Sequence, residues 1–249
     1  MALHNTFKPR IRIAFALSLL AAALPAVAGS FSISPLRVEL SDRKRIEALT
    51  VRNEQDSEAV IQVLAQAWTQ SDGQDILQAT RDVLATPAVF TLAPKGQQII
   101  RVALRRPADT ERELTYRILL QEVPNATSSD FNGLRVSLRL SLPIFVAPTG
   151  GASFKLDSAL SWRTELRDEK LLVETVNTSK RHVQIFDCAA TFDESTPAMR
   201  NSVGKYLLAG SRTSWTIAPP PNAGRQKTSF KLSCLTDQGE VDAELPVPR

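Results

Sequence analysis

Apolar and polar residues alternate in short runs along almost the whole chain from residue 31 onward. A period of two residues predicts β-strands, because successive side chains of a strand point to opposite faces of a sheet. Clusters that favour turns, such as Ser71-Asp72-Gly73-Gln74 and Ala93-Pro94-Lys95-Gly96, separate the runs. No run keeps a helical period for longer than about two turns, so the pattern predicts an all-β fold.

The predicted strands fall into two sets on either side of Pro148-Thr149-Gly150-Gly151, a sequence that interrupts strands and favours a flexible connection. The first set is Phe31–Glu39, Ile46–Asn53, Ala59–Thr69, Ile76–Asp82, Val89–Leu92, Gln97–Leu104, Leu114–Val123 and Leu134–Val146. The second set is Leu160–Leu166, Leu171–Asn177, His182–Phe192, Val203–Leu208, Ser214–Ala218, Thr228–Leu235 and Val241–Leu245.

About seven short strands with turns between them are typical of an immunoglobulin-like sandwich. We therefore predict two immunoglobulin-like β-sandwich domains, at residues 29–148 and 152–249, joined by a short linker at 149–151. The first half lacks the Cys…Trp…Cys framework of antibody domains, so antibody-type domains are excluded.

Residues 1–28 have the features of a secretory signal peptide. A basic segment precedes the apolar run Ile13–Leu24, which is twelve residues long, whereas a helix that spans a bilayer needs about 20 apolar residues. Ala26-Val27-Ala28 places small residues at the two positions that signal peptidase reads. We predict export and cleavage after residue 28; the alternative is an uncleaved membrane anchor.

The exported chain is nearly neutral. The 249-residue sequence has a net charge of +4, and removal of Lys8, Arg10 and Arg12 with the signal peptide lowers it to +1. Nucleic-acid binding requires a concentration of positive charge that neutralises phosphates. We therefore expect no nucleic acid among the partners.

Few residues of the exported chain could support catalysis or bind a metal. His182 is the only histidine after residue 28, and its surroundings predict an exposed strand histidine. The sequence contains no G-x-S-x-G motif and no glycine-rich phosphate-binding loop. The acidic pairs Asp72/Asp75 and Asp168/Glu169 lie in predicted turns. We expect no enzymatic activity, metal, cofactor or small-molecule substrate.

Cys188 and Cys234 are the only cysteines, and each lies in a predicted strand of the second half. Cysteines of exported proteins become oxidised when they can meet. A disulfide between neighbouring strands of the second domain is the favoured arrangement, and two separate buried thiols are the alternative.

The first half resembles the PapD-like family of periplasmic pilus (fimbrial) assembly chaperones. Seven stretches carry the resemblance in the family's order: Ile33–Val38, Leu49–Asn53, Gln66–Gln70, Ala85–Phe90, Leu92–Val102, Tyr116–Pro124 and Leu140–Pro148. The second half matches only in size, strand number and position. The resemblance implies two immunoglobulin-like domains, a location in the periplasm, and a cis peptide bond before Pro87.

The resemblance also implies a donor strand, which in this family completes a pilin sandwich that lacks its final strand. The strand alternates strictly from residue 133 to 143, with arginines and serines on one side and large aliphatic residues on the other. The residues expected to enter the subunit are Leu134, Val136, Leu138 and Leu140, whereas Leu142 and Ile144 are expected to pack in the chaperone's own sandwich.

Members of the family hold the C-terminal carboxylate of the subunit with basic residues. Arg37 matches the arginine of the first strand, but Pro143 occupies the position of the usual lysine. This departure and the short loop 125–132 resemble the family's archaic branch, in which the arginine of a Tyr-Arg motif, here Arg117, is implied as an anchor. Arg101 is a further candidate that we expect to be structural.

The resemblance therefore implies a chaperone that folds pilin subunits by donating a β-strand and delivers them to an outer-membrane usher. An exposed apolar donor strand would also allow the free protein to self-associate. The alternative function is an exported two-domain immunoglobulin-like module for adhesion or scaffolding.

Overall fold

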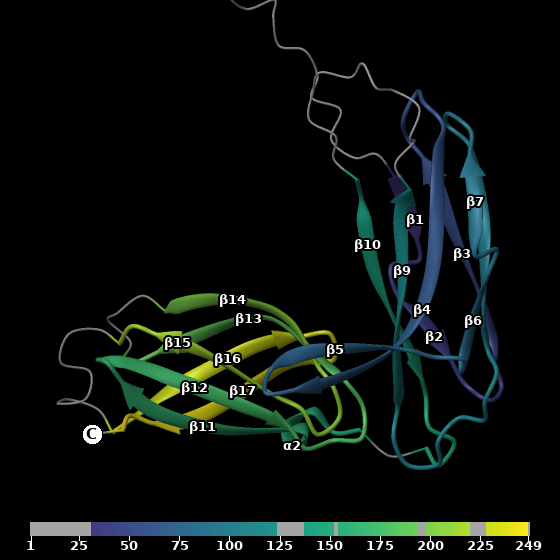
Figure 1. The fold of residues 1–249 in the computed structure, drawn as a ribbon. Coiled ribbons are helices and arrows are strands. Elements are labelled where there is room, and N and C mark those ends of the chain that lie inside the picture. Colours follow the sequence, from purple (N-terminus) through teal and green to yellow (C-terminus); the bar gives the residue numbers. More distant parts are fainter. Residues whose placement is uncertain (1–30, 124–136, 152–153, 194–197, 220–227, 249) are drawn as a thin grey trace, which may run out of the picture. The chain divides into compact units, whose positions relative to one another are not determined.

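The computed structural model describes residues 31–123, 137–151, 154–193, 198–219 and 228–248. Phe31–Arg249 forms one compact unit, distinct from residues 1–30. Its secondary structure is almost entirely β, and the single described helix is α2 (Leu156–Ala159). Within the described ranges, none of the helices has the length and apolar character needed to cross a membrane. Figure 1 shows four sheets arranged as two sandwiches.

The first sandwich is built from two sheets that hold all described strands up to Val146. One sheet has the order β1 (Phe31–Ser34), β3 (Ile46–Asn53), β8 (Gln97–Leu104) and β6 (Val83–Thr86). The other has the order β2 (Val38–Leu40), β10 (Arg139–Val146), β9 (Leu114–Val123), β4 (Ala59–Ser71) and β5 (Gln74–Ala79), and β7 (Val89–Leu92) also pairs with β4.

Alternate residues of both sheets fill the core of the first sandwich, as a period of two requires. Leu49, Ile100, Ile118 and Ile144 are fully buried in it. Leu142 and Ile144 thus lie in the chain's own core, as predicted. The turn between β4 and β5 has positive φ at Asp72 (50°) and Gly73 (75°), the backbone that a tight hairpin favours.

The second sandwich contains the remaining strands. A three-stranded sheet has the order β11 (Leu160–Arg167), β12 (Lys170–Asn177) and β15 (Arg212–Ile217). The facing sheet has the order β14 (Met199–Leu207), β13 (Val183–Thr191), β16 (Ser229–Thr236) and β17 (Gly239–Pro246). A second core, which includes Leu171, Ile185, Phe230 and Leu232, fills the space between these sheets.

A disulfide joins Cys188 on β13 to Cys234 on β16, and both residues are buried. The two cysteines are direct register partners on neighbouring antiparallel strands. The predicted pairing is therefore confirmed, and the alternative of two separate thiols is excluded.

The all-β fold of two immunoglobulin-like sandwiches is confirmed, and most strand boundaries fall within two residues of their predicted positions. The predicted strand Phe31–Glu39 divides into β1 and β2, which belong to different sheets, because Pro35 has no N–H to donate. The Ser34–Pro35 and Thr86–Pro87 peptide bonds are both cis. Strand β6 was not predicted as a separate strand. The domain boundaries at 29–148 and 152–249 stay a prediction.

Candidate functional site

One edge of β10 lacks a strand partner over part of its length. Strand β9 pairs with β10 along all of Arg139–Val146, whereas β2 covers the opposite edge only at Ile144, Phe145 and Val146. Among the residues that the structure describes, no strand pairs with that edge between Arg139 and Pro143. An unpaired row of backbone N–H and C=O groups is a template for adding a strand from another chain.

The apolar row predicted to enter a partner is only partly within the described ranges. Leu134 and Val136 lie outside the described residues. Leu138 and Leu140 are half-buried, and their entry into a partner stays a prediction. Both side chains line a small cavity of about 10 Å³ with Glu122 and with apolar residues of the first sandwich that include Phe31 and Ile33. The row therefore continues the apolar interior toward the unpaired edge.

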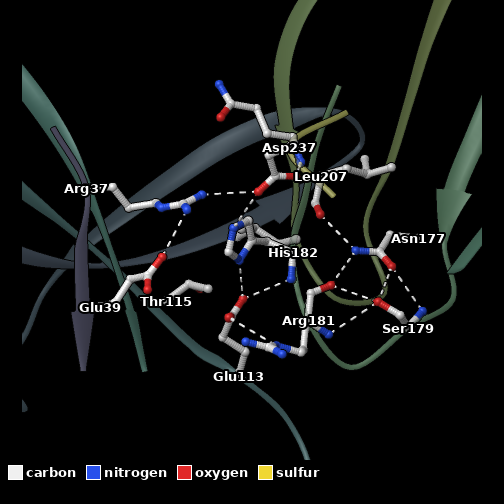
Figure 2. A network of polar contacts seen from close by, with 12 residues as sticks. Arg37, Glu39, Glu113, Thr115, Asn177, Ser179, Arg181, His182, Leu207 and Asp237 are labelled. Carbon is white, nitrogen blue, oxygen red and sulfur yellow. Dashed lines mark hydrogen bonds and ion pairs between the residues drawn. The ribbon is translucent and has the colours of Figure 1, made fainter. Parts of the chain in front are cut away.

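Arg37 lies directly before β2, close to the point where β2 begins to pair with the edge of β10. Its guanidinium lies 3.0 Å from a carboxylate oxygen of Glu39 and 3.1 Å from one of Asp237 (Figure 2). The Asp237 side chain is only 7% exposed. Both terminal nitrogens of Arg37 are thus already engaged by carboxylates of its own chain.

His182 is buried between two carboxylates, so the prediction of an exposed strand histidine is wrong. Its Nδ1 lies 2.7 Å from Oε2 of Glu113, and its backbone N–H donates to the same oxygen at 2.9 Å. Its Nε2 lies 3.4 Å from Oδ2 of Asp237, a charge contact longer than a good hydrogen bond. The ring stacks on Phe145 of β10 with centroids 3.5 Å apart. Figure 2 shows the ring between the two acids.

The two carboxylates favour the charged form of this histidine. Burial alone would lower the pKa of His182, but Asp237 and Glu113 outweigh it and raise the pKa. For Asp237, burial would raise the pKa, but His182 and the backbone N–H of Gln184 lower it. The network therefore favours the protonated imidazole of His182 between two carboxylates, with Arg37 at its outer end.

Sequence reasoning missed this network. Glu113, which is 2% exposed in its side chain, and Asp237 gave no signal in the sequence because they lie in connections between strands. The one available signal was that His182 is the only histidine of the exported chain. Its position beside the strand β13 did not reveal which residues approach from other elements.

Arg117 lies on β9, where its register partner on β10 is Pro143, the residue at the usual lysine position. The guanidinium lies over the ring of Trp68 at 3.7 Å from the centroid and 5.5 Å from that of Tyr206. A terminal nitrogen lies 3.5 Å from Oδ2 of Asp75. The side chain is 14% exposed, and burial lowers the pKa of Arg117 while Asp75 offsets part of that effect.

Arg37 and Arg117 both lie close to Tyr206 of β14. Burial raises the pKa of Tyr206, and the two arginines offset part of that rise. The two candidate anchors therefore border a common region, together with the aromatic residues Trp68 and Phe145. Arg101 is exposed on β8, in the other sheet of the first sandwich. No group of three or more potential metal ligands occurs in the described part of the chain.

Comparison with known proteins identifies a family and a fold. A family profile described as pili and flagellar-assembly chaperone, PapD N-terminal domain, matches residues 30–152. A comparison with curated protein sequences finds no match.

Several solved structures share the fold over most of the chain. A chain of the CsuC–CsuE chaperone–tip adhesion subunit complex, from archaic chaperone-usher Csu pili of Acinetobacter baumannii, has a TM-score of 0.64 and 17% identity. This match covers 87% of the present chain and 98% of that chain. The E. coli chaperone DraB has a TM-score of 0.59 and 19% identity, covering 87% and 96%. CupB2 of Pseudomonas aeruginosa has a TM-score of 0.56 and 19% identity, covering 87% and 100%.

Proposed function

Because this chain is a PapD-like chaperone, matched by the family's N-terminal domain over residues 30–152, we propose that it acts in the periplasm on pilin subunits. It binds an incomplete subunit by donating a β-strand and delivers the subunit to an outer-membrane usher. The unpaired edge of β10 between Arg139 and Pro143 carries this proposal.

The edge offers both components of strand donation. Its backbone groups can form the main-chain hydrogen bonds of an added strand. The alternate apolar residues Leu134, Val136, Leu138 and Leu140 can fill pockets of a subunit, and burial of one such side chain contributes roughly 1.5–3 kcal/mol. Ordering and association consume part of this gain. The same row supports self-association of the free chaperone.

Arg37 and Arg117 are the proposed anchors for the C-terminal carboxylate of the subunit. A guanidinium suits this role because it can bind a carboxylate through two parallel N–H donors. Arg37 is engaged by two internal carboxylates at about 3 Å, whereas Arg117 has one, at 3.5 Å. Arg117 is therefore the more available of the two and can replace the lysine that Pro143 excludes.

The proposal is tested by co-expressing the chain in the periplasm with a small exported subunit encoded beside it and measuring capture by pull-down. Leu138→Gln should reduce capture at least tenfold, because a polar amide would enter an apolar pocket of the subunit. Since Leu138 is only half-buried, the thermal unfolding temperature should change little.

Leu84→Gln is the matched control, because Leu84 is a 49% exposed leucine on β6 of the opposite sheet. It should capture as much subunit as the parent. A folded Leu138→Gln chain that captures as well as this control would refute strand donation by β10. If the parent captures no encoded subunit, the result favours an exported adhesion or scaffolding module.

A further inference from the structure

A cavity of about 190 Å³ lies in the second sandwich, between the turn that contains α2 and the connection from β12 to β13. Three cationic residues line it: Lys155, directly before α2, and Lys180 and Arg181, in the connection. None of the described residues in its lining is acidic, and the exposed Asp157 of α2 lies outside it. Three positive charges around one cavity attract anions, because their fields add.

The chain's own acids neutralise these cations only weakly. Nζ of Lys180 lies 3.9 Å from Oε2 of Glu111. Nε of Arg181 lies 4.0 Å from Oε1 of Glu113. Both distances exceed the length of a charge-assisted hydrogen bond, about 2.7–2.9 Å. Within the described ranges, no carboxylate lies at ion-pair distance from Lys155. The N–H donors of all three side chains are therefore available to a ligand.

Hydrogen bonds fix the backbone on both sides of the cavity. The side-chain amide of Asn177 donates to the carbonyl of Arg181 at 2.7 Å, and its oxygen accepts from the N–H of Ser179 at 3.0 Å (Figure 2). The N–H of Thr178 donates to the carbonyl of Ala159 at 2.8 Å, which joins the connection to the end of α2. Because the backbone is already held, a ligand would have to order only side chains, which lowers the cost of binding.

The number and the type of these cations suit a phosphate group better than a carboxylate. A phosphate monoester has a charge of about −1.5 to −2 near pH 7 and carries three strong acceptor oxygens. Three cationic side chains can each bind a different oxygen, whereas a carboxylate offers two oxygens in one plane. The guanidinium of Arg181 can donate two parallel N–H groups to a phosphate, and each lysine adds a compact charge.

We propose that this cavity is a phosphate-binding site, in which Lys155, Lys180 and Arg181 bind the oxygens of one phosphate group. The group is either inorganic phosphate or the headgroup of an anionic lipid, and both present the same chemistry to the cavity. Neither the described residues of β10 nor the two proposed anchor arginines line it. The site therefore goes beyond the proposed function and does not depend on strand donation.

The site is tested by titrating the full exported chain with inorganic phosphate at pH 7 and constant ionic strength, since added salt would screen the cations. The line width of the phosphate ³¹P signal gives the affinity, and the NMR signal of the Arg181 Nε–Hε group gives the location. Phosphate should bind in the millimolar range and shift the Arg181 signal. Lys155→Gln and Lys180→Gln should each weaken binding at least threefold. Both side chains are exposed, so the fold should be retained.

Lys170→Gln is the matched control, because Lys170 is an exposed lysine of the same sandwich, in the β11–β12 turn outside the cavity. It should bind phosphate as tightly as the parent does. Equal affinity in Lys155→Gln, Lys180→Gln and this control would overturn the proposal, as would an Arg181 signal that phosphate does not shift. N-acetylglycine that binds as tightly as phosphate would also overturn it, because the cavity would then not select a phosphate group.

Cosedimentation with lipid vesicles distinguishes the two sources of the phosphate. One set of vesicles contains phosphatidylcholine alone, and the other also contains phosphatidic acid, whose headgroup is a phosphate monoester. If the parent binds the second set at least fivefold better than the Lys155→Gln/Lys180→Gln double variant does, the site is assigned to a lipid headgroup. Equal cosedimentation of the two chains assigns it to inorganic phosphate. Because no arm uses a subunit, a chain that captures none would still give a decisive result here.

Discussion

At the scale of single residues, two buried asparagines serve the same purpose in the two sandwiches. Asn53 ends β3 and Asn177 ends β12, and both are fully buried. The side-chain amide of Asn177 donates to the carbonyls of Arg181 and Leu207, at 2.7 and 2.8 Å, and its oxygen accepts from Ser179 (Figure 2). Each asparagine thus satisfies backbone groups where a strand gives way to a turn.

An Asn177→Asp variant should test how much this arrangement contributes. The carboxylate would face the carbonyl oxygens of Arg181 and Leu207 with no N–H to donate to either, and Arg181 would keep only the bond from the Ser179 hydroxyl. A buried polar group that loses its partner costs about 1–3 kcal/mol. We expect the free energy of unfolding to fall by roughly 3 kcal/mol or more at pH 7.5, and to recover partly at pH 5 as the new carboxyl group takes up a proton.

Chemical denaturation at both pH values measures this effect. Asn201→Asp is the control, because Asn201 lies on β14 with a half-exposed side chain. It should change stability by about 0.5 kcal/mol or less. A loss in Asn177→Asp no larger than in the control would contradict the role assigned to the amide.

At the scale of strands, the alternation of apolar and polar residues was sufficient to predict the bounds of a strand where one face is buried and the other exposed. Strands β3, β7, β8 and β9 begin and end where the pattern placed them. It failed at β6, which lies between the predicted strands Ile76–Asp82 and Val89–Leu92. It also failed at His182, since burial beside acids that lie in connections between strands leaves no periodic signal in the sequence. The cavity beside α2 could not be predicted for the same reason, because its cations lie in such connections.

The disulfide between β13 and β16 should stabilise the second sandwich without a part in subunit capture. It closes a loop with a sequence separation of 46, which in the chain-entropy model is worth about 4 kcal/mol. The double variant Cys188→Ala/Cys234→Ala should lose roughly 3–4 kcal/mol of stability in denaturation, while the folded fraction still captures subunit. Loss of capture in a folded double variant would show that the bridge has a further role.

At the scale of the whole molecule, one charged network connects the two sandwiches. Arg37, Glu113 and Phe145 belong to the first sandwich, and His182 and Asp237 belong to the second. Burial of charges is costly unless each is paired, and here each acid lies beside His182 (Figure 2). Arg37 also pairs with Asp237 at 3.1 Å, and Arg181 lies 4.0 Å from Glu113. His182 is the cation of this network that can lose its charge near neutral pH.

The titration of His182 predicts how stability varies with pH. The pKa of His182 is raised in the folded chain, above about 6.5 in the unfolded chain. A raised pKa contributes stability that is fully present below the unfolded value and is lost as the pH rises through the folded value. The parent should therefore be more stable than a His182→Gln variant at pH 6, and the difference should shrink toward pH 8.5.

Thermal unfolding of both chains between pH 6 and pH 8.5 gives the difference in stability, because the titrating groups outside this network are common to the two chains and cancel. Glutamine can still donate to one carboxylate, but it cannot carry the charge that faces Glu113 and Asp237 together. A difference that stays constant over this range would mean that His182 acts only through packing on Phe145. A difference that narrows as the pH rises would instead establish that the charged imidazole helps to join the two sandwiches, because no other histidine lies in the exported chain.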